Sequence, residues 1–165
     1  CTQRSPQCLL CPLQARCIAL RTGDPQRLPI KTRRLKRGRR ESDWLLLEWR
    51  GLFWLAPRAE EGIWARLWSV PEFEELGAVS GSWPGQHERL PSVMHVLTHL
   101  DWLLKPVWWT LPDTLSSAEV DQVLGSLPQR EGGRWLSLQE AQALGLPAPL
   151  RRVIESIELS PARRA

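Results

Sequence analysis

The chain has 165 residues and 42% of them are apolar, which is enough for one ordinary domain with a sizeable core and an appendage. Its formal net charge is +4, and it contains 10 Trp but no Tyr. The apolar runs are shorter than the ~20 residues that a membrane span needs. The residues that follow Cys1 do not form the charged, apolar and small-residue pattern of a secretory signal. We therefore expect neither a membrane protein nor a secreted one.

All four cysteines lie within the first 17 residues, with spacings of six, two and five residues between them: Cys1, Cys8, Cys11 and Cys17. Disulfides would require an oxidising compartment. Zinc sites usually take paired Cys-x2-Cys knuckles or a Cys/His mixture, and here there is one such pair. A [4Fe–4S] cluster takes four thiolates from a compact, irregular loop. The spacing favours an iron–sulfur cluster, with zinc as the second interpretation.

The same spacing, with Cys11-Pro12-Leu13 at its centre, resembles the cluster loop of the endonuclease III and MutY glycosylases. The resemblance implies that the four cysteines bind a [4Fe–4S] cluster, and that residues 1–21 end a helical catalytic domain. A first residue that is not Met indicates either a removed leader or the tail of a longer protein, and a motif crowded against the very start favours the tail. In this family the loop between the first two ligands directs basic side chains toward the DNA backbone. Arg4 in that loop and Arg16 before the last ligand are the expected phosphate contacts; an ordinary exposed arginine is the alternative for Arg4.

A linker is predicted over residues 22–41, because a polar stretch with Gly23, Pro25 and Pro29 precedes a basic block. The block contains seven basic residues and no acid: Lys31, Arg33, Arg34, Lys36, Arg37, Arg39 and Arg40. The rest of the chain contains the other 15 basic residues and all 18 acidic ones, so its net charge is −3. Such a block is typical of a solvated segment or of one that lies on phosphates.

Strands are predicted next. The apolar runs 44–49 and 52–56 flank Arg50-Gly51 and predict a β-hairpin. Residues 63–73 are apolar but interrupted by Pro71, which indicates a loop that enters a short strand. Two further strand-like runs cover about 90–97 and 100–109.

Three helices are predicted after the strands. Capping boxes begin the first two, at Ser116 with Glu119 and at Ser137 with Glu140; we expect the second of these helices to end at Gly145. Apolar stripes at helical spacing mark the first and the last helix: Val120, Val123, Leu124 and Leu127; Leu150, Val153, Ile154 and Ile157. The pattern predicts an α+β domain over residues 42–159.

Two segments of this domain resemble the C-terminal domain of the MutY adenine DNA glycosylases. Residues 61–74, EGIWARLWSVPEFE, are similar to its Gly-Leu-Trp segment. Residues 95–99, His-Val-Leu-Thr-His, are similar to its His-x-Phe-Ser-His stretch. The resemblance implies a Nudix-like mixed sheet flanked by helices, preceded by the cluster loop and the basic linker. It also implies a cytoplasmic, nucleoid-associated bacterial protein.

The function that this resemblance implies is the removal of adenine mispaired with 8-oxoguanine in double-stranded DNA, after the adenine is flipped out of the stack. The family's catalytic acids precede the cluster, so this chain is expected to supply none and to be inactive alone. The family's serine faces the lesion, and Thr98 occupies its place here, with Leu97 for the phenylalanine. Thr98 and, more weakly, His99 are therefore the expected DNA contacts. The linker is a candidate contact for repair proteins.

Alternatives stay open for several of these features. Thr98 alone reads as a hydroxyl at a strand end, and His95 with His99, on one face of a strand, as structural or phosphate-contacting residues rather than a metal pair. A Nudix hydrolase needs Gly-x5-Glu-x7-Arg-Glu-U-x-Glu-Glu-x-Gly-U, but from Gly62 its first Glu position falls on Trp68. No register supplies the carboxylates that would bind Mg²⁺, which disfavours that activity. A zinc-stabilised nucleic-acid-binding module is the third hypothesis.

Overall fold

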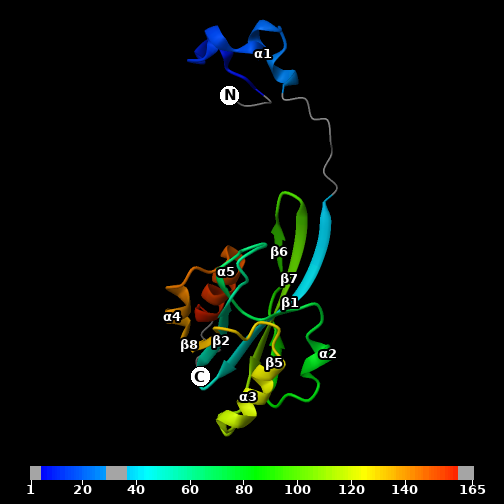
Figure 1. Ribbon diagram of the computed structural model, residues 1–165, viewed down its shortest axis with the longest axis vertical. Helices are drawn as coiled ribbons and strands as arrows, with labels where there is room; N and C mark the ends of the chain where they lie inside the picture. The colour runs from blue at the N-terminus through cyan, green and yellow to red at the C-terminus, as the bar shows by residue number, and fades with distance from the viewer. Residues whose placement is uncertain (1–4, 29–36, 160–165) are drawn as a thin grey trace. The chain divides into compact units, whose positions relative to one another are not determined.

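A computed structural model describes residues 5–28 and 37–159, so Cys1 and Arg4 lie outside the described residues. The chain divides into two compact units, Cys1–Lys36 and Arg37–Ala165. Figure 1 colours the described part of the first unit in blue and the second from cyan to red. Among the described residues no helix has both the length and the apolar character that crossing a membrane requires.

The first unit consists of short helical turns. They are the 3-10 helices η1, Cys8–Leu10, η2, Gln14–Arg16, and η3, Pro25–Arg27, and the single-turn α1, Ile18–Arg21. None of these elements contains a buried residue. Local hydrogen bonds, such as Cys11 N–H to the Cys8 carbonyl at 3.2 Å, define the turns. Local bonds rather than a core therefore shape this loop.

The second unit is built on one mixed sheet in the order β3-β2-β1-β7-β5, with β4 also paired to β1, β6 to β7 and β8 to β2. β1 and β7 run parallel over eleven residue pairs, from Gly38 with Leu100 to Glu48 with Thr110. The other pairings are antiparallel. The strands are β1 Gly38–Trp49, β2 Leu52–Pro57, β3 Trp68–Ser69, β4 Glu72–Phe73, β5 Gln86–Arg89, β6 Val93–Val96, β7 Leu100–Thr110 and β8 Arg134–Leu136.

The predicted hairpin is confirmed as β1 and β2. Its turn residues, Arg50 and Gly51, have φ values of 52° and 74°. Positive φ at both central residues gives a turn whose twist matches that of the flanking strands. The turn brings Trp49 opposite Leu52.

β1 begins at Gly38, inside the interval 22–41 that was predicted to be linker. The basic residues Arg39 and Arg40 are thus strand residues. The cause is tertiary, because β7 extends to Leu100 and offers a parallel partner to Gly38. The runs predicted at 90–97 and 100–109 are observed as β6 and β7. The short elements α2, β5 and β8 were not predicted.

The helices are α2 Gly77–Ser80, α3 Ser117–Gly125, α4 Leu138–Gln142 and α5 Ala148–Glu158. Both predicted capping boxes are present, at Ser116 with Glu119 and at Ser137 with Glu140. α4 ends at Gln142, before the predicted Gly145. The Gly145 carbonyl instead accepts a hydrogen bond from Trp68 N–H at 2.9 Å, which joins this segment to β3.

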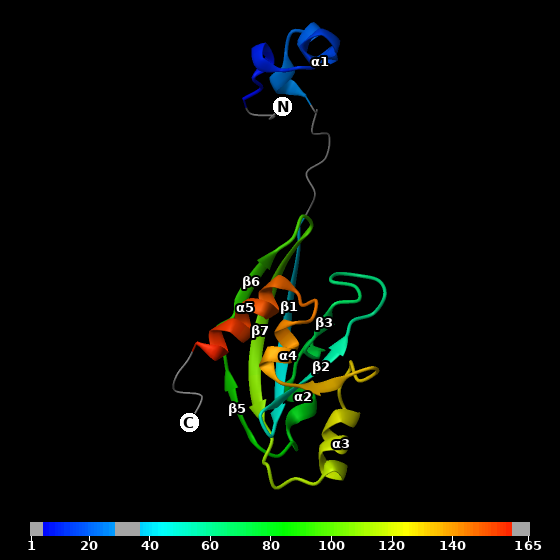
Figure 2. The same ribbon diagram turned by 90° about the vertical axis from the view of Figure 1, so that its left-hand side faces the viewer.

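Two apolar clusters form the core, one on each face of the sheet. Alternate residues of β1 feed them, because successive strand side chains point to opposite faces. Trp44 and Leu46 pack with α4 and α5, whereas Leu45 and Leu47 pack with α3. Figures 1 and 2 show α4 and α5 against one side of β1 and β7. Helices on both faces of a mixed sheet confirm the predicted α+β class.

Candidate nucleic-acid interface

The three described cysteines lie around one pocket of the first unit. Cys8, Cys11 and Cys17 are free thiols and half-buried. They line a pocket of about 800 Å³, together with apolar side chains such as Leu10 and Leu20. η1 begins at Cys8 and ends directly before Cys11, and η2 ends directly before Cys17. The predicted ligands thus open onto a common space.

The donor set fits a thiolate-bound cluster in its chemistry. Free thiols from one irregular loop, with apolar side chains around them, are what a [4Fe–4S] cluster requires. Among residues 5–28 and 37–159, however, no group of three or more Cys, His, Asp or Glu side chains is close enough to hold a metal ion. The cysteines share a pocket without forming a closed ligand shell, and Cys1 lies outside the described residues. The four-ligand assignment stays a prediction.

Arg16 occupies the last turn of η2, directly before Cys17. Its side chain is exposed. An exposed guanidinium beside the cysteine pocket can reach a phosphate without further burial. The phosphate contact of Arg16 stays a prediction.

Thr98 and His99 form the tip between β6 and β7. Both residues are exposed. Leu97 N–H donates to the Leu100 carbonyl at 2.8 Å and brings the two strands together. In Figure 2 this tip is at the end of the sheet away from α3. The threonine hydroxyl and the imidazole are thus available to an external partner.

The start of β1 lies against this tip. Gly38 N–H donates to the His99 carbonyl at 2.9 Å. Arg37 donates to the Leu97 carbonyl at 2.7 Å. Its guanidinium also lies 3.3 Å from Asp101. The structure therefore joins the last residues of the basic block to the Thr98–His99 turn, a contact that sequence reasoning missed.

His95 belongs to an aromatic cluster beside the tip. Its ring lies 5.0 Å from that of Trp64, which stacks on Trp102 at 5.0 Å with an interplanar angle of 15°. The Arg40 guanidinium lies 4.3 Å from the Trp102 ring centroid. His95 and His99 do not share a strand face as predicted, because β6 ends at Val96 and His99 is in the turn. His95 is therefore a packing residue.

Glu72 lies in the segment 61–74, which resembles the Gly-Leu-Trp segment of the MutY C-terminal domain. Its side chain is 6% exposed and pairs with Arg40 at 2.6 Å and with Arg58 at 3.1 Å. Two guanidiniums thus occupy its carboxylate oxygens. α2, with the sequence GAVS, contains no carboxylate. The residue set needed to bind Mg²⁺ on a helix is missing at this place in the fold.

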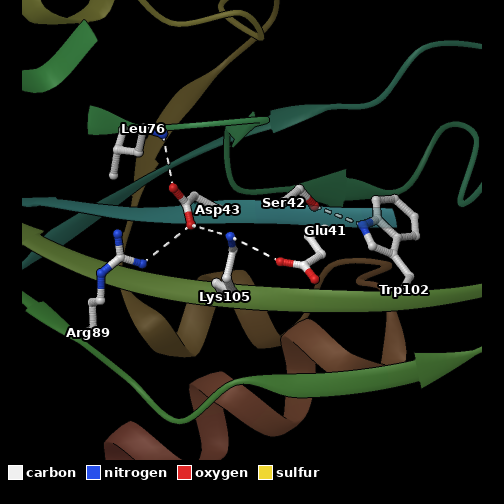
Figure 3. Close-up of polar contacts among 7 residues, drawn as sticks. All are labelled: Glu41, Ser42, Asp43, Leu76, Arg89, Trp102 and Lys105. Atoms are coloured by element: carbon white, nitrogen blue, oxygen red, sulfur yellow. Dashed lines mark hydrogen bonds and ion pairs between the residues drawn. The ribbon is translucent and has the colours of Figure 1, made fainter. Parts of the chain in front are cut away.

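Figure 3 shows a second polar network, centred on Asp43 of β1. This carboxylate is buried and accepts Leu76 N–H at 2.9 Å. Arg89 lies 3.4 Å and Lys105 3.8 Å from its other oxygen. Two cations and a backbone donor compensate the buried charge. The network joins β1 to β5, to β7 and to the segment before α2.

Residues 43–156 match the family model described as a NUDIX domain. Over 162 residues, the chain is 24% identical to an adenine DNA glycosylase of Buchnera aphidicola subsp. Schizaphis graminum (strain Sg). This alignment covers 94% of the present chain and 44% of that protein. The chain thus spans less than half the length of the curated relatives it matches.

Solved structures share the fold of the second unit. The C-terminal domain of mouse MUTYH, in complex with human PCNA, superposes with a TM-score of 0.50 at 19% identity, over 72% of this chain and 86% of that one. The E. coli ORF135 protein gives 0.53 at 19% identity, over 78% and 96%. These similarities concern the fold, and they confirm the predicted Nudix-like sheet. The cluster loop expected before it is not part of that confirmation.

Proposed function

The chain belongs to the NUDIX domain family, and the alignment with its glycosylase relative extends beyond that domain to most of the chain. We therefore propose that it is the C-terminal part of an adenine DNA glycosylase. The observation that carries the proposal is the extent of the alignment. The family model covers residues 43–156, whereas the glycosylase alignment covers 94% of the chain. One relative therefore accounts for most of both units in the same order.

The proposed reaction is the removal of adenine mispaired with 8-oxoguanine. The acids that cleave the glycosidic bond belong to the part of the full-length protein that precedes this chain. The present chain supplies recognition of the opposite base and the cysteine loop. The isolated chain is accordingly inactive on the mispair.

Lesion recognition depends on two atoms that distinguish 8-oxoguanine from guanine. N7 carries a hydrogen in the lesion, and C8 carries an oxygen. A hydroxyl can accept from the first or donate to the second, and Thr98 presents one at an exposed tip. The preceding residue is Leu97, which is half-buried. Because leucine has no ring, the turn supplies the hydroxyl without an aromatic side chain to stack on the base. A hydrogen bond of this kind discriminates between bases by about 1–3 kcal/mol.

Phosphate contacts extend this surface. His99 neighbours Thr98, and Arg39 is exposed on β1. Arg4 and Arg16 supply the corresponding contacts near the cysteines. Each neutralised phosphate releases counterions, so DNA affinity falls as the salt concentration rises. The part of the basic block that precedes β1 is a second phosphate-binding segment and a contact for repair proteins.

Cys1, Cys8, Cys11 and Cys17 are the proposed ligands of a [4Fe–4S] cluster. When bound, the cluster would fix the loop's shape rather than take part in bond cleavage, because hydrolysis of an N-glycosidic bond transfers no electrons. The pocket shared by the three described thiols supports this assignment. Iron and labile sulfide, measured after anaerobic purification, test it; zinc in a colourless protein would favour the zinc-stabilised module instead.

The decisive experiment uses the full-length protein that contains this chain. We expect it to release adenine faster from a duplex with adenine opposite 8-oxoguanine than from one with adenine opposite guanine. No release from either duplex would contradict the proposal. A diphosphatase assay on nucleotides with Mg²⁺ tests the hydrolase alternative on the same preparation, and we expect no turnover because Glu72 is occupied by two arginines.

A further inference from the structure

The Thr98–His99 turn lacks the features that normally stabilise a two-residue hairpin. The favoured turns have positive φ at the first central residue or at both, to match the strand twist. Neither Thr98 nor His99 is among the residues with positive φ. Within residues 37–159, no hydrogen bond from Leu100 N–H to the Leu97 carbonyl closes the turn. The turn therefore depends on contacts from outside the hairpin.

Arg37 supplies the missing partner. Its guanidinium donates to the Leu97 carbonyl at 2.7 Å, the acceptor that a closed β-turn would satisfy internally. The same guanidinium lies 3.3 Å from Oδ1 of Asp101, on the other side of the turn. That oxygen is buried and accepts no hydrogen bond from the described residues. One side chain thus contacts the residue that precedes Thr98 and a β7 residue that follows His99.

We propose that Arg37 is a positioning residue for lesion recognition: it holds the Thr98–His99 turn in the conformation that presents the Thr98 hydroxyl. The proposal rests on the proposed function for the role of the turn, but not for the contact itself. Loss of the guanidinium leaves the Leu97 carbonyl and Asp101 without their charged partner. Hydrogen bonds to charged groups are among the stronger ones in proteins, so the turn should open more often.

The location of Arg37 gives this contact a second consequence. It directly precedes β1 and belongs to the basic block, where it comes directly after Lys36. Gly38, the next residue, donates to the His99 carbonyl at 2.9 Å. Two successive residues therefore fix the turn at the point where the preceding segment enters the sheet.

Amide hydrogen exchange in the chain tests the contact without reference to catalysis. We expect Arg37→Ala to accelerate exchange of the Leu97 and Gly38 amides by about tenfold. Arg39→Ala is the matched control: it removes the same charge two residues further along the chain, inside β1, where the side chain is exposed and the structure records no partner for it among the described residues. We expect less than about a twofold change there. Arg37→Lys, which keeps a cation and a donor, should recover part of the protection.

Unchanged exchange in Arg37→Ala would overturn the proposal, as would equal acceleration in Arg39→Ala, which would indicate general fraying of β1. In the full-length protein, Arg37→Ala should reduce the preference for adenine opposite 8-oxoguanine over adenine opposite guanine by about tenfold. Arg39→Ala should weaken binding of both duplexes alike and keep that preference.

The two readouts fail in different ways. Faster exchange with an unchanged preference would overturn the positioning role and leave Arg37 as a structural residue. If the unaltered protein shows no preference for the lesion, the proposed function fails. The exchange data would still decide whether Arg37 holds the turn.

Discussion

At the scale of single residues, the proposed function assigns the contact with the lesion base to Thr98. Threonine keeps a hydroxyl but adds a methyl group, and its branched β-carbon restricts χ1. The hydroxyl therefore has fewer orientations than that of a serine in the same place. Because the residue is exposed, its side chain is available to a binding partner and is not needed for packing.

We expect Thr98→Ala in the full-length protein to lower the preference for 8-oxoguanine over guanine by about tenfold, since the variant loses one hydrogen bond to the lesion. Thr98→Ser keeps the hydroxyl and should retain most of the preference. Single-turnover rates on the two duplexes measure it. An equal preference in the alanine variant and the unaltered protein would remove Thr98 from recognition.

Asp43 acts at the same scale on stability. Its carboxylate is 2% exposed and has Leu76 N–H, Arg89 and Lys105 as partners. Asp43→Asn removes the charge that these groups compensate, so the free energy of unfolding should fall by about 1–3 kcal/mol. Glu41→Gln is the matched control, because Glu41 pairs with the same Lys105 at 3.5 Å but is mostly exposed. We expect that variant to lose less than about 1 kcal/mol.

Urea unfolding of the chain measures both variants, and equal losses would show that the buried position of Asp43 adds nothing to its contribution.

At the scale of elements, the capping boxes determine where α3 and α4 begin. Glu119 accepts from the hydroxyl and the backbone N–H of Ser116, at 2.7 and 2.8 Å. Glu140 repeats these contacts with Ser137. In each box these hydrogen bonds hold the pKa of the glutamate below its ordinary value of 4.5. The serine hydroxyl has the larger effect and the backbone N–H the smaller. The charged form of the box is therefore the stabilising one.

This shift predicts a pH dependence of stability. Because the folded-state pKa of Glu119 is below the unfolded value, its contribution is fully present above about pH 4.5 and is lost as the pH falls through the lower folded-state pKa. Glu119→Gln should therefore be less stable than the unaltered chain near neutral pH. The difference should shrink as the pH falls below 4.5. Thermal unfolding at several pH values measures it; a difference that is constant with pH would contradict the charged capping interaction.

At the scale of the whole molecule, local signals predicted the local structure. The turn residues Arg50-Gly51 and the two capping boxes depend on neighbours in the chain, and all three were predicted correctly. The start of β1 was not, because Gly38 is a strand residue only through its pairing with Leu100. The contact of Arg37 with Leu97 joins residues 60 apart in the chain. No local pattern indicates such a pairing, so this part of the candidate site required the fold.

The cysteine loop and the sheet differ in what holds them together. The sheet has a core on each face, whereas the described elements of the first unit contain no buried residue. A loop without a core needs another source of stability, and bound metal supplies folding free energy in such cases. We therefore expect metal loss to affect the first unit and to leave the second folded.

Cys11→Ser tests this division in the full-length protein, with Gln14→Ser, another pocket-lining residue, as the control. The cysteine variant should lose most of its iron because one thiolate ligand is gone, whereas the control should retain it. Trp residues of this chain lie only between Trp44 and Trp135, so in the isolated chain their fluorescence reports the sheet alone. The urea concentration at the midpoint of unfolding, followed by this fluorescence in the isolated chain, should be unchanged in both variants. Full iron content in Cys11→Ser would remove this ligand, and a shifted midpoint would show that the sheet depends on the loop.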